Sequence, residues 1–175
     1  MTLNYIAEAT SRPELRKFAE IIRKAFNICK PYFPAIEILE KGIVQFYPEF
    51  DYEIVPDEEL DGIEGLTLPN DNLIILPERV YYGAIAGNGR ARFSVTHEIS
   101  HYILIKDTTV AMCRPDVRLP PYKKPEWQAN TLASELLIPP NLSVGMCTDE
   151  IAEIFGVSRS AANVHLNVKK KEYLP

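Results

Sequence analysis

The sequence predicts an α+β fold, in which helices surround one small sheet. Three features predict this class. Apolar residues recur at helical spacing near the N-terminus, β-forming residues gather between Gly42 and Pro77, and helical patterns return from about residue 90 to residue 170. The expected order is an N-terminal helix, a twisted sheet of about three strands, a helix with the chemical motif, a second helix with a glutamate, and a helical tail.

The N-terminal helix is predicted over Arg12–Lys30, ending before Pro31. Its apolar residues follow the three- and four-residue spacing of an amphipathic helix: Leu15, Phe18, Ile21, Ile22, Ala25 and Phe26. The strands are predicted among β-forming residues that prolines interrupt: Ile43, Val44, Phe46, Tyr47, Tyr52, Ile54, Val55, Leu66 and Ile74–Leu76. The turn residues Asn70–Asn72 predict a hairpin.

Helices are predicted over the rest of the chain, with one irregular segment between them. The first begins at Pro77 and continues through Tyr82, and the second runs from about Arg90 to Ile105. Residues 107–124 contain three prolines and no periodicity, which indicates a loop. The remaining helices are predicted over 125–138, 148–155 and 158–170.

Composition indicates a globular, soluble chain. Of its 175 residues, 46% are hydrophobic and 25% are charged, so we expect one domain over residues 1–175, with residues 145–170 as a helical tail on that domain. Residues 1–10 lack a signal sequence, and no apolar run is long enough to span a membrane. The chain has an odd number of cysteines, and they are widely spaced: Cys29, Cys113 and Cys147. This pattern favours a reducing compartment, the cytoplasm.

The chemical motif is His97-Glu98-Ile99-Ser100-His101. Histidines four residues apart lie on one helical face, so both imidazoles can reach one metal ion at about 2.0–2.1 Å. Glu98 is rotated about 100° from His97 and is therefore placed to accept a proton from a water molecule on the metal, as a general base. The motif predicts a zinc peptidase.

A catalytic zinc site needs a third protein ligand, and the motif does not supply one. No further histidine follows His101 at a ligand spacing, so a carboxylate is expected. The candidates are Glu126, Asp107, Asp116 and Glu135. Glu126 is preferred because the small residues of its helix, Ala129 and Ala133, permit close approach to the motif helix.

Two blocks of sequence resemble the ImmA/IrrE family of metallopeptidases. Residues 90–104, with Arg92-Phe93 before the histidine motif, look like the active-site helix of that family. Residues 126–139 resemble its second signature, a glutamate followed by Ala-Asn, Ala, Leu-Leu and proline. Residues 151–158 resemble the segment that commonly follows, so the resemblance covers roughly residues 72–166. One departure is Ser100, where the family usually has glycine.

The resemblance implies a zincin-like fold with zinc held by His97, His101 and Glu126, and with Glu98 as the base. It also implies a partner, since members of the family commonly cleave or relieve a helix-turn-helix repressor of a mobile element or stress response. The substrate is therefore expected to be a regulatory protein. The alternative is a non-catalytic antirepressor or a DNA-binding regulator that uses the C-terminal helices.

The tail itself has the Ala-then-Gly-Val-Ser pattern of a helix-turn-helix, with Arg159, Ser160 and Asn163 where a recognition helix would contact bases. We favour a structural role, because acidic residues of the tail and the net charge of −5 oppose DNA binding. The tail is expected to pack on the core through five apolar residues: Ile151, Ile154, Phe155, Val157 and Val164.

The residue that stabilises the oxyanion is not selected by the sequence. His165, Tyr102 and Tyr122 carry suitable side chains, and none is preferred. Cys113 is interpreted as an incidental thiol. A free edge strand of the sheet is expected to hold an extended substrate by main-chain pairing.

Overall fold

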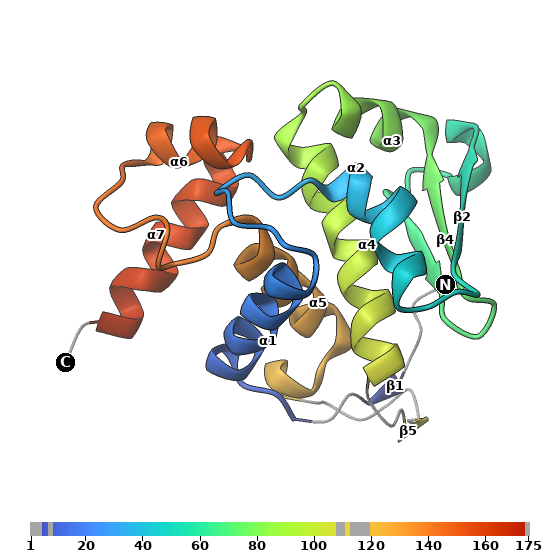
Figure 1. The fold of residues 1–175 in the computed structure, drawn as a ribbon, viewed down its shortest axis with the longest axis horizontal. Coiled ribbons are helices and arrows are strands. Elements are labelled where there is room, and N and C mark those ends of the chain that lie inside the picture. The colour runs from blue at the N-terminus through green and yellow to red at the C-terminus, as the bar shows by residue number, and fades with distance from the viewer. Residues whose placement is uncertain (1–4, 7–8, 108–110, 113–119, 174–175) are drawn as a thin grey trace.

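The computed structural model describes residues 5–6, 9–107, 111–112 and 120–173. It has the predicted mixture of helices and a small open sheet. Figure 1 shows the sheet at one end, the long helix α4 (Gly89–Asp107) in the middle, and the helices α6 (Thr148–Phe155) and α7 (Arg159–Tyr173) at the other end. None of the helices within these ranges is long and apolar enough to cross a membrane.

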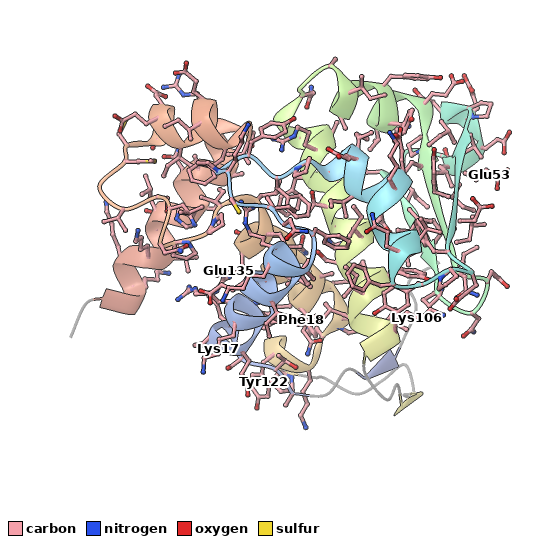
Figure 2. All side chains as sticks on the ribbon, viewed as in Figure 1. Lys17, Phe18, Glu53, Lys106, Tyr122 and Glu135 are labelled. Atoms are coloured by element: carbon pink, nitrogen blue, oxygen red, sulfur yellow. The ribbon has the colours of Figure 1, made fainter. Side chains whose placement is uncertain are left out.

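The N-terminal helix α1 (Arg12–Ala25) begins with a capping box. The Ser11 side chain accepts a hydrogen bond from the Glu14 backbone N–H, and the Glu14 carboxylate accepts one from the Ser11 backbone N–H. It ends five residues earlier than predicted (30 minus 25). Its buried residues Leu15, Ala19 and Ile22 face α5 (Pro125–Leu137). Figure 2 shows Lys17 and Phe18 on α1, with Glu135 of α5 beside that helix.

A helical stretch follows where strands had been expected. Residues Ala35–Glu37 form α2, Ile38–Gly42 a π-helical turn and Ile43–Gln45 a 3-10 turn. The prediction that Ile43, Val44, Phe46 and Tyr47 form a strand is therefore wrong. The helical conformation of this segment is explained by burial. Its apolar residues lie at helical spacing and are at most 4% exposed: Ala35, Ile38, Leu39 and Ile43. Core packing therefore overrides local β propensity.

The sheet has the strand order β2-β4-β3, from β2 (Asp51–Val55), β4 (Leu73–Pro77) and β3 (Leu66–Leu68). β2 and β4 are parallel, whereas β3 and β4 form the predicted hairpin, with Leu68 opposite Leu73. Asn72 adopts a positive φ of 56° in this turn. A 3-10 turn at Asp57–Leu60 connects β2 to the edge strand β3. β3 and β4 both pack on α4.

The remaining elements set the site. The helix α3 (Glu78–Ile85) connects the sheet to α4, whose first turn is capped by the Asn88 side chain. A short antiparallel pair, β1 (Tyr5–Ile6) with β5 (Ala111–Met112), was not predicted. A 3-10 turn at Pro121–Lys123 leads into α5, which packs along α4. The core lies where α4 and α5 meet α1, α3 and the sheet.

Candidate metal centre

His97 and His101 lie on one face of α4, as their spacing predicts. Their Nε2 atoms are 3.0 Å apart, and the two rings are nearly perpendicular, at 84°. His101 is buried and His97 is half-buried. Two ring nitrogens at this separation are close enough to bind one metal ion together.

Glu126 reaches the same point from α5. It lies in the first turn of that helix, which begins at Pro125, and its carboxylate oxygens are 3.5 Å from His97 Nε2 and 3.3 Å from His101 Nε2. Ala129 and Ala133, one and two turns further on, are fully buried. Small side chains here allow the two helices to lie close together, as the sequence indicated.

The three side chains fit a tetrahedral metal ion. Their donor atoms all lie within 4.8 Å of one another. Tetrahedral ligands about 2.0–2.1 Å from a zinc ion are about 3.3 Å apart. The two Nε2 atoms are 3.0 Å apart, His101 Nε2 is 3.3 Å from Glu126 Oε1, and His97 Nε2 is 3.5 Å from Glu126 Oε2. Two imidazoles and a carboxylate are also a common ligand set of catalytic zinc. The identity of the metal stays a prediction.

The electrostatics of the group favour a charged carboxylate. Hydrogen bonds from His101 and His97 lower the pKa of Glu126 far below its usual value. Burial lowers the pKa of His97, but the hydrogen bond with Glu126 and the charges of Glu98 and Glu126 outweigh it, so the net shift is upward. Glu126 is thus held as an anion, the form that ligates a metal.

Glu98 lies beside this group but points to the sheet. Its side chain is buried, and its Oε2 accepts a hydrogen bond of 2.6 Å from the Thr67 hydroxyl on β3. It lines the same cavity as the two histidines, so the structure brings it to the place where the sequence predicted a base. Its separation from the three donor atoms follows from its rotation around α4.

The cavity has a volume of about 540 Å³ and lies between the edge strand, α4 and α5. One wall comes from the segment that includes β3, and another comes from α4. Its lining combines the metal-binding group with apolar side chains: Ile63, Glu64, Gly65, Leu66, Thr67, Phe93, Ser94, His97, Glu98, His101, Ile105, Glu126 and Asn130. The volume is large enough for several atoms of an extended peptide.

Among the other carboxylate candidates, Glu135 is the one whose side chain the structure describes, and it is not in the group. Glu135 is buried on the side of α5 away from the cavity and pairs with Arg12 at 3.0 Å and Arg16 at 2.9 Å. Asp116 lies outside the described residues, as does Cys113. Asp107 ends α4, and its side chain lies outside the described part of the chain.

The three residues considered for the oxyanion do not line the cavity. His165 is buried in the tail, where its Nε2 is 2.9 Å from the Ser143 hydroxyl. Tyr102 is fully buried and packs against Tyr47 and Phe50. Tyr122 is exposed, and Figure 2 shows it near the start of α5.

The tail packs on the core through part of the predicted set. Ile151, Phe155 and Val157 are buried, whereas Ile154 and Val164 remain 42% and 57% exposed, so their predicted burial is wrong. The exposure of Val164 has a geometric reason. On α7 the buried positions are Ala162 and His165, three residues apart, and Val164 lies outside the helix face that they share.

Two of the three residues expected to contact bases, Arg159 and Asn163, form contacts within the tail. Arg159 forms an ion pair of 2.7 Å with Asp149, and Asn163 accepts a hydrogen bond of 2.7 Å from the Thr148 hydroxyl. Both contacts join α7 to α6. They place acidic and polar groups of α6 beside the presumed recognition surface, which is unfavourable for binding phosphate.

Three residues near the site were not found from the sequence. The Thr67 hydroxyl on the edge strand bonds to Glu98, Gly65 directly before that strand leaves space for the Glu98 side chain, and Arg92 is a fully buried cation five residues before His97. Thr67 is the buried residue of a three-residue strand between two half-buried leucines, a pattern with no chemical signature. Arg92 belongs to the block that carried the family resemblance, yet its contacts are with distant segments.

Comparison with known protein families gives a match over much of the chain. A family model described as the IrrE N-terminal-like domain, a peptidase family, matches residues 60–167. The match covers the edge strand, both helices of the metal-binding group and most of the tail. A search of curated proteins found no match.

Proposed function

The chain belongs to the peptidase family of IrrE N-terminal-like domains, and on this premise we propose that it is a zinc-dependent endopeptidase. The observation that carries the proposal is the convergence of His97, His101 and Glu126 within 4.8 Å, with the Glu98 carboxylate on the same cavity. This is the ligand set and base that hydrolysis of a peptide bond by a metal centre requires.

A metal ion held by the three side chains would lower the pKa of a water molecule and polarise the scissile carbonyl. The residues of the chain bind the peptide, transfer the proton of the attacking water and exclude bulk water. Glu98 accepts one proton from the attacking water, whose oxygen bonds to the carbonyl carbon. Glu98 then gives that proton to the amide nitrogen, the C–N bond breaks, and an acid and an amine leave.

The edge strand β3 supports the binding of an extended substrate. Among the strands that the structure describes, it pairs with β4 alone, and it runs beside the cavity, so its other side is available for main-chain hydrogen bonds. Leu66 of the strand and Phe93 and Ile105 of α4 offer apolar contacts to the substrate's side chains. An extended backbone on β3 would pass the Glu98 carboxylate.

We propose that the substrate is a regulatory protein, in particular a transcriptional repressor of the helix-turn-helix type, and that the reaction takes place in the cytoplasm. The resemblance to ImmA/IrrE peptidases supports the first proposal. The second is supported by Cys29 and Cys147, which are exposed free thiols of the kind that a reducing compartment preserves.

The test compares the zinc-loaded chain with Glu98→Gln in a lysate of the source cell, by labelling and sequencing newly formed protein N-termini. Glu53→Gln is the control, since Glu53 is an exposed glutamate of β2, on the outside of the sheet in Figure 2. Wild type and Glu53→Gln should generate the same new N-termini, and Glu98→Gln should generate none. New N-termini that persist in Glu98→Gln would contradict the mechanism, and their absence in wild type would contradict the function.

The partner is tested separately by incubating the chain with a purified helix-turn-helix repressor encoded beside its gene. Cleavage that requires zinc and Glu98 supports the proposed substrate. Binding without cleavage, at equal affinity in wild type and Glu98→Gln, would instead support an antirepressor that acts by holding its partner.

A further inference from the structure

The edge strand contacts the proposed base directly. The Thr67 hydroxyl lies 2.6 Å from Glu98 Oε2 and 3.1 Å from the Glu98 backbone oxygen. Both residues are buried, at 5% and 8% exposure. They are 31 residues apart in the chain, so the contact is a property of the fold.

A second residue, directly before β3, shapes the space around Glu98. Gly65 is two residues before Thr67, and residues two apart in an extended segment face the same side. A Cβ on Gly65 would lie 2.5 Å from Glu98 Cγ and 2.9 Å from its carboxyl carbon. These atoms belong to the buried stem of the glutamate, so any larger residue at position 65 must displace that side chain.

The hydrogen bond from Thr67 has a defined direction. A threonine hydroxyl has one proton, and a carboxylate is the stronger of its two neighbouring acceptors. The separation of 2.6 Å is in the range of charge-assisted O–H to carboxylate bonds. Glu98 Oε2 is therefore engaged from the sheet side. Oε1 lies beside Gly65, 3.0 Å from where a Cβ would be.

We propose that Thr67 and Gly65 position the general base: the hydroxyl of Thr67 fixes one carboxylate oxygen of Glu98, and the missing side chain of Gly65 leaves room for the other to face the substrate. This inference rests on the proposed peptidase function and deepens it. Thr67 acts through Glu98 and is a positioning residue. It also joins the strand that would hold the substrate to the group that moves the proton.

The first experiment is kinetic and uses the zinc-loaded full chain. The probe is a quenched fluorescent peptide that spans the scissile bond found in the lysate experiment. Thr67→Val has nearly the same shape without the hydroxyl and should lower kcat about 10- to 100-fold, the usual effect of losing an outer partner. KM and bound zinc should stay at wild-type values. Thr67→Ser restores the hydroxyl and should recover most of kcat.

Gly65→Ala and Thr96→Val complete the kinetic set. Gly65→Ala should lower kcat with zinc retained, because the added methyl group displaces Glu98. Thr96 is a buried threonine of α4 whose hydroxyl bonds to the Arg92 carbonyl at 2.8 Å, so Thr96→Val removes a comparable hydroxyl without touching Glu98. Its kcat should match wild type. A kcat for Thr67→Val within twofold of wild type, or an equal loss in Thr67→Ser, would overturn the proposal.

The second experiment measures the contact without catalysis. The urea midpoint of the zinc-loaded chain is compared for wild type, Thr67→Val, Glu98→Ala and the double variant. Thr67→Val should shift the midpoint downward more in the wild-type background than in the Glu98→Ala background. Equal shifts would show that the two side chains do not interact and would overturn the proposal. If wild type cleaves nothing, the peptidase function fails, and this comparison still decides the contact.

Discussion

Glu126 and Glu135 lie on the same helix, and their carboxylates point to opposite sides of it. Glu126 faces His97 and His101, whereas Glu135 is bonded to Arg12 and Arg16 of α1. They are nine positions apart (135 minus 126), which on a helix is about 180° beyond two whole turns. One helix therefore serves the metal group on one side and the N-terminal helix on the other.

Glu126→Ala should remove the metal. It deletes one of three protein ligands, and the two histidines that remain cannot close the site. The measurement is zinc per chain after dialysis against a weak chelator. Glu135→Ala is the matched control and should stay loaded. A loaded Glu126→Ala together with an empty Glu135→Ala would contradict the ligand assignment.

Glu135→Ala should instead lower the free energy of unfolding. The buried carboxylate is 4% exposed, and its loss removes the acceptor that joins Arg12 and Arg16 of α1 to α5. Breaking a fully buried pair costs about 3–5 kcal/mol, and the cost here should be smaller because Arg12 and Arg16 are 22% and 23% exposed. Urea unfolding of the zinc-loaded chain measures it. Glu126→Ala, compared without metal, should change the free energy of unfolding much less.

Part of the site could be predicted from the sequence, because the spacing of the two histidines fixes their shared face on a helix. His97 and His101 share a face on any helix. Glu126 and Glu135 lie on a second helix, and their spacing prevents both from facing the helix of the two histidines. The hairpin at Asn70–Asn72 was predictable for the same reason, since the chemistry of a turn is local. The family resemblance then singled out residues that the spacing left open.

What could not be predicted depends on contacts between distant segments. Ile43 and Val44 have β propensity, but they form a 3-10 turn in which Ile43 packs into the core. The local sequence does not indicate this conformation. Thr67 meets Glu98 across 31 residues, and a single threonine between leucines gives no sign of it. Burial of Ile151 but not of Ile154 likewise depends on where α6 docks.

The tail should not bind DNA with sequence selectivity. Arg159 is paired with Asp149, and the surrounding α6 carries further acidic residues, so phosphate contacts are opposed. Arg159→Ala with Asn163→Ala should leave DNA affinity at the weak level of wild type. Fluorescence anisotropy with DNA from the region upstream of its gene, at about 150 mM salt, measures it. Tight, selective binding by wild type that this double variant loses would favour the transcription-factor alternative.

Stability should fall in mild acid because of His165. Burial lowers the pKa of this histidine below its ordinary value of 6.5, despite the nearby charge of Glu135, and Lys169, Arg16 and Arg12 lower it further. As the pH falls, His165 therefore binds a proton more readily in the unfolded chain than in the folded chain. This contribution to the free energy of unfolding is complete above about pH 6.5 and is lost progressively as the pH falls below it.

Urea unfolding at several pH values, for wild type and His165→Gln, isolates this effect. The other titratable groups, including those at the metal site, are common to both proteins. The free energy of unfolding of wild type should decline more steeply below pH 6.5 than that of the variant. Parallel curves would show that His165 is not the group responsible.

Arg92→Met should loosen the tail from α4. The Arg92 side chain is 1% exposed and donates hydrogen bonds to the carbonyls of Phe155 at 2.8 Å, Phe33 at 2.6 Å and Gly156, while its guanidinium stacks 3.8 Å from the centre of the Tyr32 ring. Two of these carbonyls end α6, where the helix dipole favours a cation. Methionine fills the space but leaves all three oxygens without this donor. Because hydrogen bonds to charged groups contribute about 1.5–3 kcal/mol each, the free energy of unfolding should fall by at least about 3 kcal/mol.

Arg90→Met is the matched control for Arg92→Met, two residues earlier on the same helix. Arg90 pairs with Glu64, yet its side chain is 80% exposed, and exposed ion pairs contribute about 0–1 kcal/mol. Its free energy of unfolding should therefore stay within about 1 kcal/mol of wild type. Hydrogen exchange then locates the change: the amides of α6 should exchange faster in Arg92→Met and at the wild-type rate in Arg90→Met. Equal protection of α6 in both variants would show that the buried arginine does not hold the tail.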